Sequence, residues 1–114
     1  MKQTLVWKGG EHPFWLRIGE LRALQQHCDA GPFWVYGRLI SGQWRVEDVR
    51  ETLRLGLIGG GMSEKDAGKL VDQSLEEFDF LRHRVVAARK TFDLAHRMKN
   101  RRMIPAAEPA TDLR

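Results

Sequence analysis

A run of three glycines directly after an amphipathic segment constrains the fold of this chain more than any other feature. Between residues 44 and 62, apolar side chains recur at spacings of three and four, which places them on one helical face: Val46, Val49, Leu53 and Leu57. Gly59, Gly60 and Gly61 then allow the left-handed backbone that ends many helices. The sequence therefore predicts a central helix with a glycine stop.

The same triplet raises the alternative of a phosphate-binding loop. A Walker loop has a strand before its glycines and a Lys-Ser or Lys-Thr pair after them. Here a helical pattern comes first, and Met62 and Ser63 follow the glycines. Ser63 fits the N-cap of the next helix, with the acidic Asp66 three positions later, close to a capping box. We therefore interpret Gly59–Gly61 and Ser63 as structural residues.

The N-terminal residues 3–18 predict a β-hairpin. Thr4–Lys8 forms the first strand, and His12–Ile18 forms a return strand in which apolar and other residues alternate. Gly9 and Gly10 lie between them as the expected turn. A lone hairpin is marginal in water, so we expect it to pack on the helices that follow. The fold class is therefore α+β, with the hairpin packed on a mostly helical domain of four to five helices.

Helical patterns occupy residues 19–98. The segment 29–32 interrupts them, with Gly31 as the expected C-cap of the first helix and Pro32 at the first position of the second. In the last helix, an apolar seam from Phe78 would place Lys99 in the core if it continued. We therefore predict a single globular domain over 1–98 and a flexible tail over 99–114, which is basic and contains two prolines.

The composition narrows the class of protein. A length of 114 residues with 42% hydrophobic content fits one soluble domain. No apolar run approaches the roughly 20 residues that span a bilayer, and we see no signal peptide after Met1. The single cysteine, Cys28, excludes an intrachain disulfide and fits a reducing cytoplasm.

No catalytic or metal-binding pattern stands out, so we expect no enzyme activity, no cofactor and no metal. His27 and Cys28 are adjacent and would point to different helix faces, and the other histidines lie far away in sequence. Cys28 falls on an apolar helix face, which favours a buried structural thiol over a nucleophile.

The carboxylates of the central helix are interpreted as solvated. Glu47, Asp48 and Glu51 stand beside arginines on what the pattern predicts to be polar helix faces. Pairs of Glu47 with Arg50 and of Glu51 with Arg54 would contribute only tenths of a kcal/mol each, as surface pairs about one turn apart do. Solvated ion pairs therefore explain these residues without catalysis.

Four tryptophans are many for a chain of this length: Trp7, Trp15, Trp34 and Trp44. Two interpretations stay open. Large side chains can fill a small core, or some of them can anchor a partner, because Trp is enriched at the hot spots of protein interfaces. The candidates for partner binding are Trp34, inside the helix predicted over 33–40, and Trp44, four residues after its end.

The positive charge belongs to the C-terminal third. Residues 1–81 carry 10 basic and 12 acidic side chains, whereas residues 82–114 carry 9 basic and 3 acidic ones. The basic run includes Arg84 and four candidate partner contacts: Arg82, Arg89, Lys90 and Arg97. It is interpreted as a solvated helix face, or as a site for an acidic protein or nucleic acid. Nucleic acid is the least favoured, because aromatic residues that stack on bases do not interleave the run.

Four segments in a fixed order give the chain a resemblance to a known family. They are Gly19–Leu24 (GELRAL), Arg38–Gly42 (RLISG), the helix that ends in the glycine triplet, and Ala67–Asp72 (AGKLVD). Their order and spacing over residues 3–97 resemble the small tail protein of gene transfer agents and related siphophage-like prophages. That family is described as a tail assembly chaperone and has also been labelled a tail tube protein.

The resemblance implies a non-enzymatic phage-tail assembly factor that binds the tape measure protein or the tail tube protein until the tail polymerises. The implied location is the cytoplasm of the bacterial host or the assembled virion, with no membrane association. Two alternatives stay open: a structural subunit of the tail tube, and a small basic protein that binds nucleic acid. Neither the oligomeric state nor the identity of the partner follows from the sequence.

Overall fold

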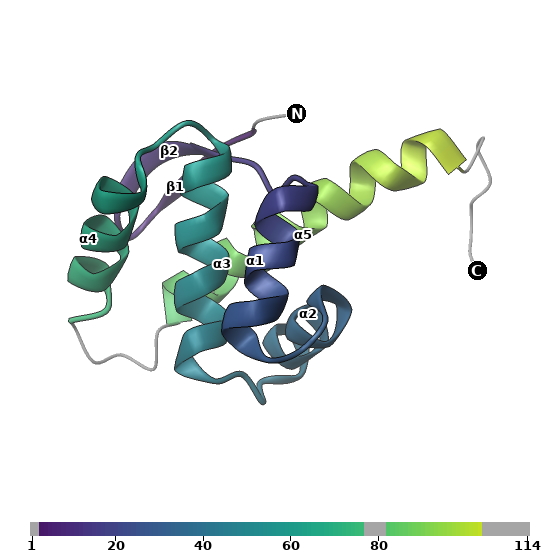
Figure 1. Cartoon of the computed structure of the whole chain (residues 1–114), viewed down its shortest axis with the longest axis horizontal. Helices are drawn as coiled ribbons and strands as arrows, with labels where there is room; N and C mark the ends of the chain where they lie inside the picture. The colour runs from purple at the N-terminus through teal and green to yellow at the C-terminus, as the bar shows by residue number, and fades with distance from the viewer. Residues whose placement is uncertain (1–2, 77–81, 104–114) are drawn as a thin grey trace.

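The structure is a computed structural model that describes residues 3–76 and 82–103; for residue 3 and residues 93–103 it describes the backbone alone. Its elements, labelled in Figure 1, are β1 (Gln3–Trp7), β2 (Gly10–Phe14), α1 (Ile18–Cys28), α2 (Pro32–Ser41), α3 (Val46–Gly59), α4 (Glu64–Ser74) and α5 (Arg82–Met103). Within the described residues, a two-stranded antiparallel hairpin and five helices confirm the predicted α+β class.

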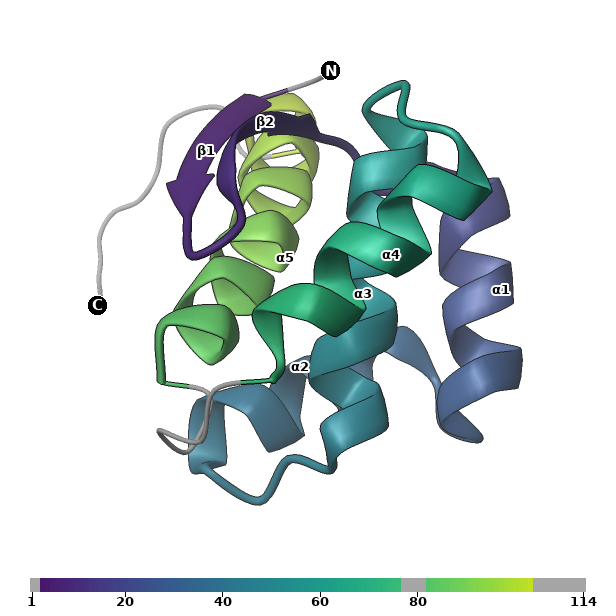
Figure 2. The ribbon, with the colours of Figure 1, turned by 90° about the vertical axis from the view of Figure 1, so that its left-hand side faces the viewer.

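Helix α3 lies at the centre of the molecule. Figures 1 and 2 show α1 and α4 beside it, and α3 also contacts α2, α5 and β2. Val49, Leu53 and Leu57 are buried, as their spacing predicted, whereas Val46 in the first turn is half exposed. Burial extends beyond that face, because Thr52 on another side of the helix is also fully buried. The central helix is therefore enclosed on most sides and is not simply amphipathic.

The hairpin differs from the prediction at its turn and at its end. Trp7 pairs with Gly10, so the turn lies at residues 8 and 9 and not at residues 9 and 10. Strand β2 ends at Phe14, whereas the predicted return strand ran to residue 18. The reason is a tertiary hydrogen bond: the N–H of Trp15 donates to the carbonyl oxygen of Gly56 in α3 at 2.9 Å. The chain therefore leaves the sheet and turns onto α3.

The glycine triplet has two different roles. Helix α3 ends at Gly59, and among the three glycines only Gly61 adopts a positive φ, of 118°. A Cβ on Gly59 would lie 1.8 Å from the carbonyl oxygen of Trp15, and a Cβ on Gly60 would lie 2.1 Å from that of Pro13. Gly59 and Gly60 are therefore required by the close approach of residues 13–15, at the end of β2 and directly after it, and only Gly61 is required by left-handed backbone.

The end of α1 also differs from the prediction. The helix ends at Cys28, and the left-handed C-cap is Asp29, with φ 52°, instead of Gly31. Asp tolerates this region better than most residues because its short side chain can hydrogen-bond locally. Gly31 is instead the extended N-cap of α2, and Pro32 takes the first helical position as predicted. The N-cap of α4 is Ser63, whose Oγ accepts a hydrogen bond from the N–H of Asp66 at 3.1 Å.

Helix α5 continues past the predicted domain boundary at residue 98 and runs to Met103. Figure 1 shows its C-terminal half extending beyond the body formed by the other elements. Phe78, where the apolar seam of the last helix was predicted to begin, lies outside the described residues, as do residues 104–114, so the flexible tail stays a prediction. No helix in the described part of the chain combines the length and the apolar character needed to cross a membrane.

Candidate protein-binding surface

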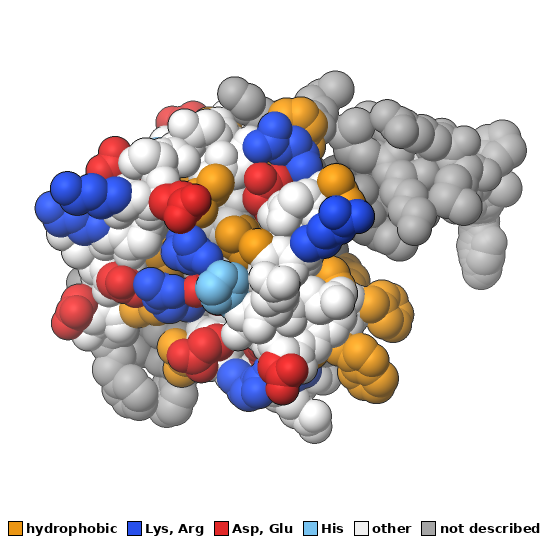
Figure 3. Space-filling view, viewed as in Figure 1, with side chains coloured by type: hydrophobic (Ala, Val, Ile, Leu, Met, Phe, Trp, Pro, Cys, Tyr) orange, Lys and Arg blue, Asp and Glu red, His pale blue; other side chains and the backbone are white. Residues whose placement is uncertain are grey.

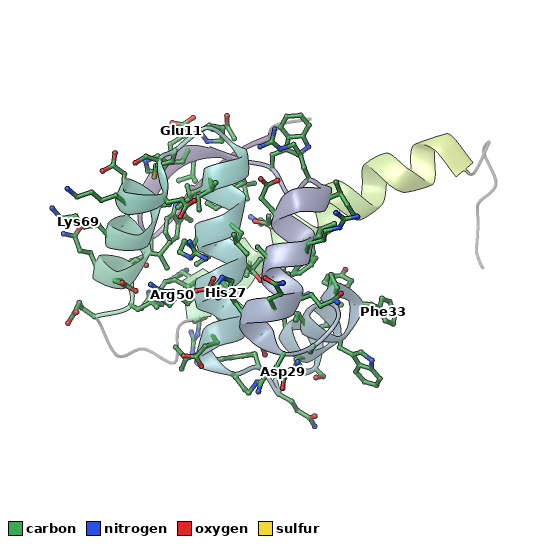
Figure 4. The ribbon with its side chains drawn as sticks, viewed as in Figure 1. Glu11, His27, Asp29, Phe33, Arg50 and Lys69 are labelled. Atoms are coloured by element: carbon green, nitrogen blue, oxygen red, sulfur yellow. The ribbon has the colours of Figure 1, made fainter. Side chains whose placement is uncertain are left out.

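Helix α2 turns two large aromatic side chains toward solvent. Phe33 and Trp34, directly after Pro32, are 84% and 71% exposed. The inner side of the same helix holds Val35 and Leu39, which are buried in the core. Figure 4 shows Phe33 pointing away from the body, and Figure 3 shows apolar side chains projecting in the same place. Two adjacent exposed aromatics are informative, because soluble domains rarely leave large apolar side chains clustered in water.

The helix that carries the pair is fixed to its neighbours. Its Tyr36 ring packs against Phe92 of α5, with ring centroids 5.4 Å apart. Its Arg38 Nε lies 3.6 Å from Oδ2 of Asp48, a fully buried carboxylate in α3. The aromatic side chains therefore project from a positioned helix and not from a loop. Such preorganisation lowers the entropy lost when a partner binds.

Four exposed residues of α2 without a polar side chain form what we call the aromatic face: Phe33, Trp34, Gly37 and Ile40. Ile40 is 50% exposed, and the polar Ser41, four residues after Gly37, is exposed beside the face at the end of the helix. A Cβ on Gly37 would meet no atom within 4 Å, which leaves a gap between the aromatic pair and Ile40.

The tryptophans divide between the two interpretations. Trp7 belongs to the core and packs edge-on against Phe14, with ring centroids 5.9 Å apart. Trp44 is half-buried and packs against the core, in the connection between α2 and α3. Trp34 is therefore the partner-binding candidate that stands free of the core, and Trp44 is not part of the aromatic face. The exposed neighbour Phe33 was not singled out from the sequence.

Only part of the basic run of α5 is exposed to solvent. Arg82, Arg89 and Lys90 are exposed, but Arg84 is completely buried, which corrects its assignment to the outer face. Helix periodicity explains this, because Arg84 shares the inward side of α5 with Ala88, four residues on. Arg97 lies in α5, but its side chain is outside the described residues. The described cations of α5 thus form a smaller patch than the sequence suggested.

The interpretation of the α3 carboxylates as solvated pairs is wrong for two of them. Asp48 is completely buried, and Glu51 is 3% exposed. Glu51 accepts hydrogen bonds from Arg50 and from Nη2 of Arg54, the latter at 2.6 Å. Arg50 turns toward Asp72 of α4, with Nε to Oδ1 at 2.7 Å, and not toward Glu47. The reason is that α3 is covered by α1 and α4, so its polar positions face neighbouring helices.

This charged cluster ties three helices together. The Arg50 hydrogen bond is the main reason why the pKa of Asp72 lies below its usual value. His27 of α1 adds its Nδ1 at 4.0 Å from Oε1 of Glu51. Figure 4 shows His27 beside Arg50, and Figure 3 shows charges of both signs around the histidine. The hydrogen bonds of Glu51 to guanidinium groups suit a structural role.

Cys28 takes part in a second polar contact, between α1 and α3. The guanidinium of Arg45 donates to the carbonyl oxygen of Cys28, and the N–H of Arg45 donates to Oδ2 of Asp48 at 2.9 Å. Burial, together with the negative charges of Asp48 and Glu51, raises the pKa of Cys28 to about 12. The thiol is therefore protonated at neutral pH and a poor nucleophile. In the part of the chain that is described, no three His, Cys, Asp or Glu side chains are grouped as a metal would require.

A family model described as "Phage tail tube protein, GTA-gp10" matches residues 1–93 of the chain. The match covers the hairpin, α1 to α4 and the first half of α5, including the aromatic face. It confirms the resemblance that the order of the four sequence segments indicated. No curated protein and no solved structure matches the chain.

Proposed function

Because the match spans residues 1–93, the chain belongs to the GTA-gp10 family of phage tail tube proteins, and on that premise we propose that it acts as a non-enzymatic tail assembly factor. In this role it binds an apolar segment of another tail protein, the tape measure protein or the protein that builds the tube, until the tail polymerises. The exposure of Phe33 and Trp34 on a fixed helix is the observation that carries the proposal.

The aromatic face has the features of a binding hot spot. Burying one large apolar side chain in an interface contributes about 1.5–3 kcal/mol. Trp is also enriched among the residues that dominate binding energies. Phe33 and Trp34 together with the gap at Gly37 therefore suit an apolar helix of the partner, laid across α2. No bond has to be made or broken in such a role.

Co-expression tests this function. The chain is produced with the tape measure protein, and separately with the tube-forming protein, of the same phage or gene transfer agent. Soluble yield of the partner and co-elution in gel filtration are measured. We expect at least one partner to become soluble in a complex, and Trp34→Ala to weaken that complex at least tenfold, since about 1.4 kcal/mol corresponds to tenfold in affinity.

Ile18→Ala is the matched control, because Ile18 is a large apolar side chain, 67% exposed, on a different helix. It should leave the complex unchanged. If neither tail protein forms a complex with the chain, or if Ile18→Ala weakens it as much as Trp34→Ala, the proposal is wrong.

The family description supports a second candidate, a structural subunit of the tail tube. The two functions differ in the fate of the protein. An assembly factor is absent from finished particles or present in traces, whereas a tube subunit is present in many copies. Quantitative mass spectrometry of purified particles distinguishes them: copy numbers equal to those of the tube-forming protein would favour the structural role.

A further inference from the structure

Strand β1 borders a second surface, which is independent of the aromatic face because other elements form it. Between β1 and α5 lies a groove of about 430 Å³. Its lining residues are Leu5, Val6, Trp7, Lys8, His83, Val86, Ala87 and Lys90. The buried members of this set are apolar, and its exposed members include all three basic side chains. Figure 2 shows β1 on the outer side of the hairpin, with α5 behind it.

The outer edge of β1 can form further backbone hydrogen bonds. In an antiparallel pair, residues that exchange two backbone hydrogen bonds alternate with residues that exchange none. Pro13 has no N–H, so its pair with Thr4 is of the second kind, and so is the pair of Val6 with Glu11 two residues on. The N–H and C=O groups of Thr4 and Val6 therefore point away from β2. No described residue hydrogen-bonds to them.

The side chains of α5 opposite this edge follow a simple order. His83 and Lys90 stand one helical turn on either side of Val86 and Ala87, so a basic, an apolar and a basic position follow one another along the groove. Val86 is 41% exposed and Val6 is 77% exposed, so both are available for contact. Among the described residues, no acidic side chain lines the groove; Glu11, which pairs with Val6, lies on β2 outside the lining.

We propose that an extended, acidic segment of a partner protein adds to the outer edge of β1 as a third strand. Every second side chain of an added strand faces the same way. The segment that fits carries an acidic, an apolar and an acidic residue at three such successive positions. The carboxylates face His83 and Lys90, the apolar side chain rests on Val86, and the backbone bonds to Thr4 and Val6. Recognition by strand addition, with alternate side chains giving specificity, is a general mode of peptide binding.

A titration of the full chain with synthetic peptides tests the proposal. The probe is the acidic peptide Thr-Glu-Thr-Val-Thr-Glu-Thr, and the comparison peptide has Lys in place of both Glu. Amide chemical shifts of the ¹⁵N-labelled protein report the site. We expect saturable shifts at Thr4, Val6 and Lys90 with the acidic peptide and at least tenfold weaker binding of the lysine peptide.

A charge reversal makes the test specific. Lys90→Glu should weaken binding of the acidic peptide at least tenfold and should strengthen binding of the lysine peptide. The matched control is Lys69→Glu, because Lys69 is an exposed lysine on α4, away from the groove (Figure 4). It should change neither affinity. Val6→Pro, which removes an outward N–H at a position like that of Pro13, should abolish binding without unfolding the domain.

Three results would overturn the proposal. The first is the absence of saturable shifts at Thr4 and Val6, or equal affinity for the two peptides. The second is a change in the amide chemical shifts of Thr4 and Val6 with protein concentration alone, which would assign the edge to a second copy of the chain. The third is nuclear Overhauser contacts between residues 104–114 and β1, which would assign it to the protein's own C-terminal residues.

Discussion

Glu51 shows how one buried carboxylate can hold helices together. It is 3% exposed and accepts hydrogen bonds from Arg50 and Arg54. We expect Glu51→Gln to lower the free energy of unfolding by about 2–3 kcal/mol, because it leaves the partly buried guanidinium of Arg54 without its counter-charge and removes one of the two carboxylate partners of Arg50. Glu64→Gln, an exposed acid in the first turn of α4, should change it by less than about 0.5 kcal/mol. Urea unfolding of both variants measures the difference; equal stabilities would contradict this role.

Asp72 should make a small, pH-dependent contribution to the free energy of unfolding. Hydrogen bonding to Arg50 holds the pKa of Asp72 below its usual value in the folded protein. A carboxyl with a lowered folded pKa stabilises the fold above its unfolded pKa of about 3.9, and this contribution is lost as the pH falls through the folded pKa. The side chain is 54% exposed, so Asp72→Asn should cost only about 0.5 kcal/mol at pH 7.

The cost of Asp72→Asn should shrink as the pH falls below about 4 and vanish at lower pH. Chemical unfolding of both proteins between pH 2.5 and pH 7 measures this difference. A cost that grows on acidification would show that the Arg50 contact does not stabilise the folded state.

Among the helices, α3 depends on glycines for its contacts and α2 does not. A Cβ on Gly59 would clash with the Trp15 carbonyl, so we expect Gly59→Ala to lower the free energy of unfolding by about 3 kcal/mol. Gly37 lies on the exposed side of α2 with open space around it. Gly37→Ala should therefore raise stability by about 0.5–1 kcal/mol. Thermal unfolding of the two variants checks the contrast, and equal effects would contradict it.

Periodicity predicted the helices well, because it is a local property of the chain. The buried face of α3 and the placement of Pro32 at the start of α2 followed from spacing alone. Spacing did not predict where β2 ends or that Asp48 and Glu51 are buried. Both features depend on which elements cover α3. One signal was available: a glycine inside a helix, such as Gly56 three residues before the triplet, often has a packing reason.

The binding surface was predictable only in part for the same reason. A tryptophan-rich chain suggests an anchor, but only the packed fold shows that Trp34 is outside the core while Trp7 is inside it. The edge of β1 and the α5 residues beside it are far apart in sequence, so no sequence motif indicated the groove between them. Residues that meet only through tertiary packing leave little trace in the order of the chain.

At the scale of the whole molecule, the described part of α5 exposes few cations that could bind nucleic acid. Three described cations of α5 are exposed, and Arg84 is buried. We therefore expect binding to duplex DNA no tighter than the roughly 10⁻⁴–10⁻⁶ M of non-specific association, with an affinity that falls as salt rises. Fluorescence anisotropy over a salt series measures it. Nanomolar binding at physiological salt, lost in Arg82→Glu and Lys90→Glu, would favour the nucleic-acid function instead.

Site-specific cross-linking in cells that assemble tails shows which protein, if any, contacts the aromatic face. A photo-reactive benzoylphenylalanine is placed at position 33 on the aromatic face and, as a control, at the exposed position 18 of α1. After irradiation, mass spectrometry identifies the cross-linked protein. We expect position 33 to capture the tape measure protein or the tube-forming protein, and position 18 to capture neither. Capture of no tail protein from position 33, or equal capture from both positions, would contradict this expectation.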